Sequence, residues 1–196
     1  MPKTEKLTDG AEVTIRPLVQ NDLDLLAKFF LDLPFEDRKY LRIDVTNRKT
    51  VEQRLRLMEF GYHHRLVALH GGEIVAEAAL ELPFEEWRRH QGEIRVIVAR
   101  PFQRRGLGMI MMREIYCLAL RREVDTVVVW MMKPQDAAIA HARKMGFHDQ
   151  SVLPSYVKDQ SGEMQDLIIL KAKIKDLLKE IEAYFGPIDW QACPQP

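Results

Sequence analysis

The chain has no excess of charge of either sign, because 29 lysine and arginine residues balance 29 aspartate and glutamate residues. Nucleic-acid-binding domains generally carry a basic excess, so this balance disfavours nucleic acid as a partner. No apolar run approaches the roughly 20 residues that a membrane-spanning helix needs. The opening MPKTEKLTDG lacks the apolar segment of a signal peptide. We therefore expect no membrane partner.

Cysteine is scarce, with Cys117 and Cys193 as the two examples in 196 residues. Their spacing fits neither a metal site nor a disulfide framework. Cys117 falls in an apolar stretch with helical periodicity, and we interpret it as a buried thiol. Such cysteine usage is typical of a reducing compartment, so the sequence predicts a cytoplasmic protein without a metal site.

What the chain does have is a hydrophobic content of 46%, enough for a core, in a length that suits one domain. Apolar periodicity and turn residues predict alternating strands and helices. We expect strands at 12–17, 92–99 and 126–132, hairpins within 64–82 and 151–172, and helices at 20–33, 47–60, 109–123, 134–146 and 173–186. This order predicts an α/β (α+β) fold, with a mixed central sheet and helices on its faces.

The last of these helices has an apolar stripe on one face. We expect residues 1–172 to form the domain and residues 173–196 to add a C-terminal helix and tail. Periodicity leaves open whether the stripe packs on its own domain or on a second copy of the chain in a homodimer.

The segment PFQRRGLGM, residues 101–109, carries the clearest chemical signal. It lies between an expected strand and an expected helix, and the first N–H groups of a helix have no partner within it. Gly106 and Gly108 would let a bulky anion approach these N–H groups closely, while Arg104 and Arg105 add positive charge. The segment therefore has the outline of a pyrophosphate site.

Two other phosphate motifs fit this segment poorly. A dinucleotide-binding Gly-x-Gly-x-x-Gly would need a third glycine at Met111, and a P-loop would need Gly-Lys followed by serine or threonine. The remaining alternative is an exposed basic turn that binds no ligand.

The strand, QRRGLG and the helix MIMMREIY together resemble the pyrophosphate-binding motif of the GNAT superfamily of acyl-CoA N-acyltransferases, Gln/Arg-x-x-Gly-x-Gly/Ala. VTIRPLVQNDLDLLAKFF looks like the first strand and helix of that family, PQDAAIAHARKMGF is similar to a later helix, and DLIILKA resembles the final strand. The resemblance covers about residues 12–173. It implies a GNAT-like, mostly antiparallel sheet with helices on both faces.

The resemblance also implies a place for coenzyme A, or acetyl-CoA as cosubstrate. The cofactor would lie where strands 92–99 and 126–132 separate, and its pantetheine arm would pair with the backbone of the first strand. Its pyrophosphate would bind the loop, and Gln135 would contact the pantetheine arm. The implied binding residues are Val96, Ile97, Val98, Gln103, Arg104, Arg105, Gly106, Leu107, Gly108, Met109 and Gln135.

The catalytic residues are harder to assign. Similar family members place a catalytic glutamate near Glu93, which implies Glu93 as the general base. Many members carry a tyrosine acid where this chain has Ala142, so His141 and Tyr156 are weaker candidates for the acid. Glu77 and Glu81 share one face of the neighbouring strand, which is either the acceptor side or a wet face of the sheet.

The resemblance implies an enzyme that transfers an acyl group, most simply acetyl, from acyl-CoA directly to a primary amine. The acceptor is a protein lysine or a small-molecule amine, and segments 33–56 and 82–91 would select it. The alternative is a non-catalytic acyl-CoA sensor or protein-interaction module on the same fold.

Overall fold

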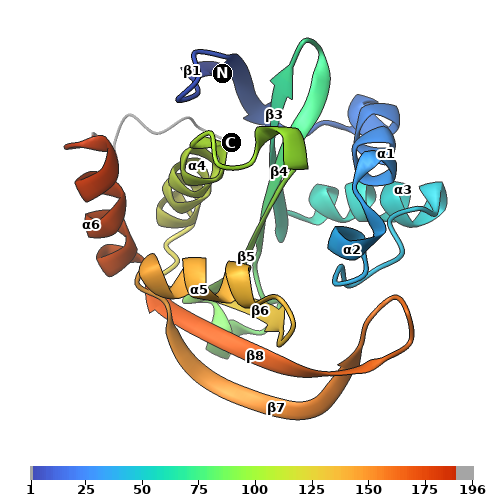
Figure 1. Ribbon diagram of the computed structural model, residues 1–196. Helices are drawn as coiled ribbons and strands as arrows, with labels where there is room; N and C mark the ends of the chain where they lie inside the picture. Colours follow the sequence, from blue (N-terminus) through green and yellow to red (C-terminus); the bar gives the residue numbers. More distant parts are fainter. Residues whose placement is uncertain (1, 189–196) are drawn as a thin grey trace.

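The computed structural model describes residues 2–188, and one eight-stranded sheet runs through them (Figure 1). Its strands lie in the order β1-β2-β3-β4-β5-β6-β8-β7, and all neighbours are antiparallel except the parallel pair β5 and β6. The strands are β1 (Lys3–Lys6), β2 (Glu12–Pro17), β3 (His63–His70), β4 (Glu73–Glu81), β5 (Gln91–Val98), β6 (Thr126–Met132), β7 (His148–Lys158) and β8 (Met164–Lys173).

Helices cover both faces of this sheet (Figure 1). They are α1 (Leu23–Asp32), α2 (Phe35–Arg38), α3 (Arg48–Arg56), α4 (Leu107–Arg121), α5 (Asp136–Lys144) and α6 (Ile174–Phe185). One core cluster joins the sheet to α4, α5 and α6, and a second joins the other face to α1 and α3. The expected fold class, with a mixed and mostly antiparallel sheet between helices, is confirmed.

Alternation along β5 connects this strand to both clusters. The side chain of Ile94 belongs to the α4 face, whereas Ile97 packs against the α1 and α3 face. Glu93 and Arg95 share the side of Ile97, because successive side chains point to opposite faces. The polar residues of β5 therefore lie on the face that α1 and α3 cover.

The hairpin between β3 and β4 follows from its glycines. Gly71 and Gly72 both have positive φ, 58° and 86°, which a tight two-residue hairpin turn requires. This turn sets the register in which His63 stands opposite Glu81 and Val67 opposite Glu77. The acidic residues of β4 thereby face fixed neighbours on β3.

Three features depart from the sequence expectations. Lys3–Lys6 forms strand β1 against β2, although KTEK has no apolar alternation to indicate it. Phe35–Arg38, which lies between the expected helices 20–33 and 47–60, forms the short helix α2. Cys117 is buried as expected, but it takes part in a disulfide bond, so its assignment as a thiol is wrong. Cys193 lies outside the described residues.

The apolar stripe of α6 packs on its own domain. Ile174, Leu177 and Ile181 are almost fully buried in the same core cluster as α4. Of the two arrangements that periodicity left open, this is the one that the structure contains. The homodimer and the domain boundary at residue 172 stay predictions.

Candidate active site

The sheet opens where β5 and β6 part. Their paired register covers Gln91–Glu93 on β5 and Thr126–Val128 on β6, whereas β5 continues to Val98 and β6 to Met132. One backbone edge of β5 therefore faces the opening after Glu93. This is the separation of strands that the sequence resemblance implied, and it brings Val96, Ile97 and Val98 to the opening.

The loop after β5 leads directly to α4. The side-chain amide of Gln103 donates a hydrogen bond of 2.9 Å to the carbonyl of Val98, which fastens the loop to the end of the strand. Arg104 and Gly106 adopt positive φ, 58° and 83°, and α4 begins at Leu107. A left-handed arginine is unusual, and such conformations are concentrated at functional sites.

The start of α4 fits an anion. Gly106 is the N-cap and forms no side-chain cap hydrogen bond, so no side chain competes for the first N–H groups at this cap. A Cβ on Gly108 would meet nothing within 4 Å, which leaves open space beside the helix start. Leu107 is buried, whereas Gly108 and Met109 are partly accessible. The residues present therefore fit a pyrophosphate group.

The two arginines of the loop differ in their surroundings. Arg104 is exposed to solvent. Arg105 forms an ion pair of 2.9 Å with Asp9, and its guanidinium stacks 5.3 Å from the centre of the Phe102 ring. The backbone carbonyl of Arg105 also accepts a hydrogen bond from Thr8. The turn between β1 and β2 thus supports the loop from the side.

Gln135 lies at the start of α5, on the other side of the opening. Its side-chain oxygen accepts a hydrogen bond of 2.8 Å from the N–H of Met132 at the end of β6. This contact holds the turn between β6 and α5, so the side-chain oxygen has a structural partner. The amide nitrogen is the group left for the ligand contact that the resemblance implied.

A cluster of arginines and glutamates lies on the face that α1 and α3 cover. Arg65 and Glu77 form an ion pair in which each side chain is 1% exposed. Glu81 accepts contacts of 3.2, 3.1 and 3.4 Å from Arg54, Arg65 and Arg95. The alternative of a wet face for Glu77 and Glu81 is therefore wrong, because arginines cover both carboxylates.

Glu93 stands opposite Glu81 in the register of β4 and β5, at the last paired position before the opening. Its carboxylate forms an ion pair with Arg42, from the connection between α2 and α3. Burial raises the pKa of Glu93 above its ordinary value, although the nearby charge of Arg42 opposes that shift. Burial also favours the neutral form of Glu81, but Arg54 and Arg65 reverse the effect and lower its pKa. Burial and the local charges thus move the pKa values of these two neighbouring carboxylates in opposite directions, upward for Glu93 and downward for Glu81.

Arg42 contacts a second group at the opening. Its guanidinium lies 4.9 Å from the centre of the Trp130 ring on β6. A guanidinium nitrogen of Arg42 also lies 3.9 Å from a carboxylate oxygen of Glu81. Trp130 is 40% exposed. Arg42 therefore bridges β5 and β6 on the face of the sheet that carries Glu93, close to where the strands part.

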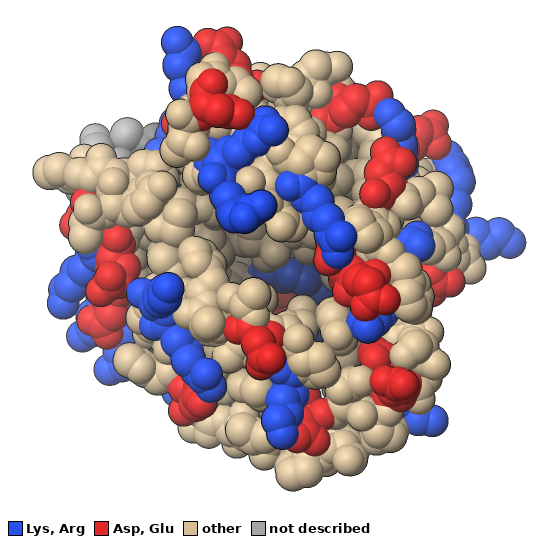
Figure 2. All heavy atoms as spheres, viewed as in Figure 1, with Lys and Arg blue, Asp and Glu red and all other residues tan. Residues whose placement is uncertain are grey.

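The segment that carries Arg42 is held by the turn between β7 and β8. The backbone N–H of Gln160 donates to the carbonyl of Lys39, and its side-chain amide donates to the carbonyl of Leu41. In Figure 2 a hollow opens at the centre of the molecule, with basic and acidic atoms in its depth. The hydrogen bonds from this turn therefore hold the main chain just before Arg42.

His141 and Tyr156, the weaker candidates for the acid, are both on exposed surface. His141 lies on the outer side of α5, next to the buried Ala142. Tyr156 is 59% exposed in an irregular part of β7, where the pairing with β8 shifts between Leu153 and Val157. The exposure of these two side chains does not show whether either acts as the acid, so both assignments stay predictions.

The two adjacent histidines at the start of β3, His63 and His64, are half-buried. Burial and the charge of Arg122 lower the pKa of His64 to about 4. Burial also lowers the pKa of His63, whose ring lies 3.9 Å from Glu81. Both rings are therefore neutral near pH 7 and do not add to the positive charge of the cluster.

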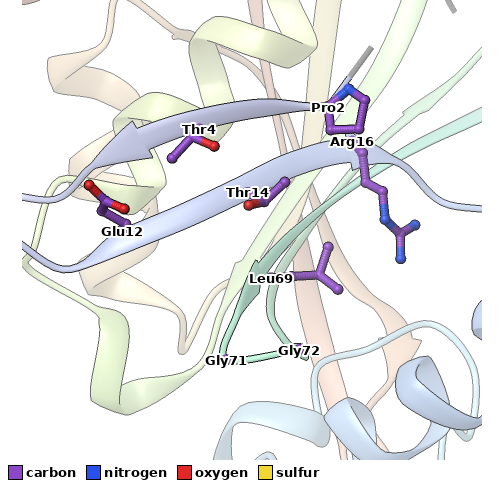
Figure 3. Close-up of a pocket in the computed structure, with 8 residues that line it drawn as sticks. All are labelled: Pro2, Thr4, Glu12, Thr14, Arg16, Leu69, Gly71 and Gly72. Atoms are coloured by element: carbon purple, nitrogen blue, oxygen red, sulfur yellow. The ribbon is translucent and has the colours of Figure 1, made fainter.

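A separate groove of about 450 Å³ lies on the other end of the sheet. Figure 3 shows it over β1, β2 and β3, and it contains none of the candidate residues. Its lining residues are Pro2, Thr4, Glu12, Thr14, Arg16, Leu69, Gly71 and Gly72. The site described above is thus defined by strand geometry and charged contacts and not by this groove.

Sequence reasoning missed Arg42, Arg95 and Trp130. The strand alternation that placed Glu77 and Glu81 on one face also places Glu93 and Arg95 together, and it could have indicated Arg95. Arg42 lies in an irregular connection without periodicity, so its contact with Glu93 had no signal in the sequence.

The family model for the acetyltransferase (GNAT) family matches residues 28–147, more than half of the chain. A search of curated proteins found no match. Among solved structures, the chain is similar to ribosomal-protein-alanine N-acetyltransferase from Brucella melitensis, with TM-score 0.69 and 24% identity over 81% of this chain and 98% of that one. It is also similar to the GNAT domain of PAT from S. lividans, with TM-score 0.72 and 18% identity over 88% and 96%.

The chain belongs to the GNAT family of acetyltransferases, enzymes that use acetyl-CoA as cosubstrate. A third similar structure is a putative phosphinothricin N-acetyltransferase, with TM-score 0.69 and 17% identity over 83% of this chain and 98% of that one. Within residues 2–188, no group of three or more histidine, cysteine or acidic side chains is arranged to hold a metal ion. No helix in the described part of the chain has the length and apolar content to span a membrane.

Proposed function

We propose that this protein transfers the acetyl group of acetyl-CoA directly to a primary amine, with Glu93 as the general base. The observation that carries the proposal is the position of Glu93, the last paired residue of β5 before the sheet opens. The loop that fits a pyrophosphate begins at the far end of the same strand. One strand thus joins the proposed cosubstrate site to the proposed base.

Each part of the site has a role in this proposal. The loop 103–109 holds the pyrophosphate through backbone N–H groups, and the open edge of β5 at Val96, Ile97 and Val98 pairs with the pantetheine arm. Glu93 accepts a proton from the amine, directly or through a water molecule, before the amine attacks the thioester carbonyl. Attack forms the C–N bond, the C–S bond breaks, and coenzyme A leaves as the thiol or thiolate.

The class of acceptor is the less defined half of the proposal. One similar structure is named for a ribosomal protein and another for phosphinothricin, so a protein amine and a small amine are both reasonable acceptors. The acceptor enters on the face of Glu81 and Glu93, between the 33–56 segment and the β7–β8 turn.

A second candidate function is a non-catalytic acyl-CoA sensor. Two observations favour it. Arg42 forms an ion pair with the carboxylate of Glu93, and buried Ala142 stands where many family members have a tyrosine. The sensor would use the same loop and the same edge of β5, but no acceptor would react.

Two measurements on the wild-type protein distinguish these candidates. A thermal-shift titration with acetyl-CoA reports binding, and thiol release is then followed with a panel of peptide lysines, polyamines and amino acids. We expect a rise in Tm and thiol release with at least one acceptor class. Binding without release on the whole panel supports the sensor, and a flat thermal-shift titration contradicts both candidates.

A further inference from the structure

The guanidinium of Arg42 lies in a place that would suit any cation. The carboxylate of Glu93 contacts it on one side, and the ring of Trp130 lies 4.9 Å from it on another. A carboxylate and an aromatic face are the two groups that attract an ammonium or guanidinium ion most strongly.

This place coincides with the position that the nucleophile must reach. Glu93 is opposite Val128 in the parallel register, and Trp130 lies two residues further along β6 on the same face. The strands part at this level, so the thioester would arrive here from the opening. An amine that is to attack must lose its proton at Glu93, where Arg42 now lies.

Arg42 can leave without unfolding its segment. Gln160 holds the backbone carbonyls of Lys39 and Leu41, so the main chain around Arg42 stays fixed. The side chain itself is 37% exposed, and its guanidinium makes the contacts with Glu93 and Trp130. Rotation about its own bonds therefore suffices to clear Glu93.

Resting on the proposed role of Glu93 as base, we propose that Arg42 occupies the binding place of the acceptor's ammonium group. The acceptor is then an unbranched primary alkylamine, such as a lysine side chain, which displaces Arg42 and binds between Glu93 and Trp130. A lysine side chain, like that of arginine, is an unbranched methylene chain with a cationic end, so its ammonium can contact both Glu93 and Trp130.

The displacement leads to a balanced transfer. The acceptor's ammonium gives one proton to the carboxylate of Glu93 and becomes the neutral amine. Its nitrogen forms a bond to the thioester carbon, the C–S bond breaks, and the sulfur leaves with the bonding electrons. The second proton lost from nitrogen neutralises the thiolate. Arg42 then returns to Glu93 after the carboxyl proton passes to solvent.

The test is a calorimetric titration of the coenzyme A-bound protein with Nα-acetyl-lysine amide, whose one charge is its ammonium group. Nα-acetyl-norleucine amide, which lacks the ammonium, is the matched control ligand. We expect Arg42→Met to bind the lysine amide about tenfold more tightly than wild type, because the competing cation is gone, and Arg42→Lys to stay near wild type. Adding Trp130→Leu to Arg42→Met should remove most of the gain. Arg42→Gln replaces the methionine variant if that variant does not fold.

The results separate this inference from the proposed function. Weaker or unchanged binding of the lysine amide by Arg42→Met overturns the inference, because Arg42 then assists the acceptor or ignores it. Equal tightening for the norleucine amide also overturns it, because the gain would not depend on the cation. Acetylation of the lysine amide is measured in parallel, and its absence with every acceptor contradicts the proposed function even where binding tightens as expected.

Discussion

The two sides of the opening between β5 and β6 are built from different kinds of groups. On the proposed cosubstrate side, the groups available for contact are backbone groups of β5 and of the helix start after Gly106. On the proposed acceptor side, the contacts are charged side chains from five separate segments: the connection that carries Arg42, α3, β3, β4 and β5. A backbone site is specified by local sequence, whereas a side-chain cluster is specified by how distant segments pack.

We expect the largest effect on the proposed cosubstrate side from a substitution that fills the space at the start of α4. Gly108→Glu places a negative charge where the pyrophosphate would lie, and like charges in contact cost several kcal/mol. We expect the affinity for coenzyme A to fall about 100-fold or more, measured by calorimetry.

Gly108→Ala is the matched control for the fold. A Cβ at this position meets nothing within 4 Å, so the variant should fold at least as stably as wild type, because alanine is the better helix former. Retained affinity in Gly108→Glu would mean that the pyrophosphate binds elsewhere.

On the proposed acceptor side, we expect substitutions to lower the stability of the fold. Arg65 and Glu77 are both 1% exposed, so removing one partner leaves a buried charge. We expect Arg65→Leu or Glu77→Leu alone to lower the free energy of unfolding by about 3–5 kcal/mol in urea titrations. The double variant should lose much less than the sum of the two.

An exposed pair provides the control for this prediction. Arg143 and Asp149 are ion-paired at 2.7 Å but about half exposed, so Arg143→Leu should cost less than about 1 kcal/mol. Additive losses at Arg65 and Glu77 would mean that the two side chains do not stabilise each other.

The smallest expected effect concerns pH and the base. A general base acts as the carboxylate, so activity is lost as the pH falls through its pKa. Because burial raises the pKa of Glu93, the acid limb of kcat/KM should lie above the ordinary glutamate value of about 4.3. The measurement is a pH–rate profile at low acceptor concentration. An acid limb at or below the ordinary value would assign the limb to another group.

The contrast between the two sides explains what the sequence could predict. The strand, QRRGLG and the helix that follows are contiguous, so their order alone indicated the loop and its place beside β5. The hairpin at Gly71 and Gly72 was likewise readable, because its turn needs two positive φ angles. The fold class followed from such local signals in chain order.

The acceptor side could not be read in this way. The solvent exposure of Glu77 depends on Arg65 across the hairpin and on the packing of α3 over this face. The periodicity of β4 indicates neither of these neighbours. Arg42 has no periodic neighbours, and its contacts with Glu93 and Trp130 arise only when three segments meet. The disulfide at Cys117 was missed because spacing along the chain does not report distance in space.

The most direct test of the central claim is single-turnover thiol release from acetyl-CoA by Glu93→Gln with a reactive amine. Glu180→Gln is the control, since that carboxylate is exposed on α6 and lies in none of the segments assigned to the site. If Glu93 is the general base, Glu93→Gln lowers the rate of thiol release about 10²- to 10⁴-fold and leaves the Kd for acetyl-CoA unchanged. A rate within about twofold of wild type would remove Glu93 from the mechanism and contradict the account.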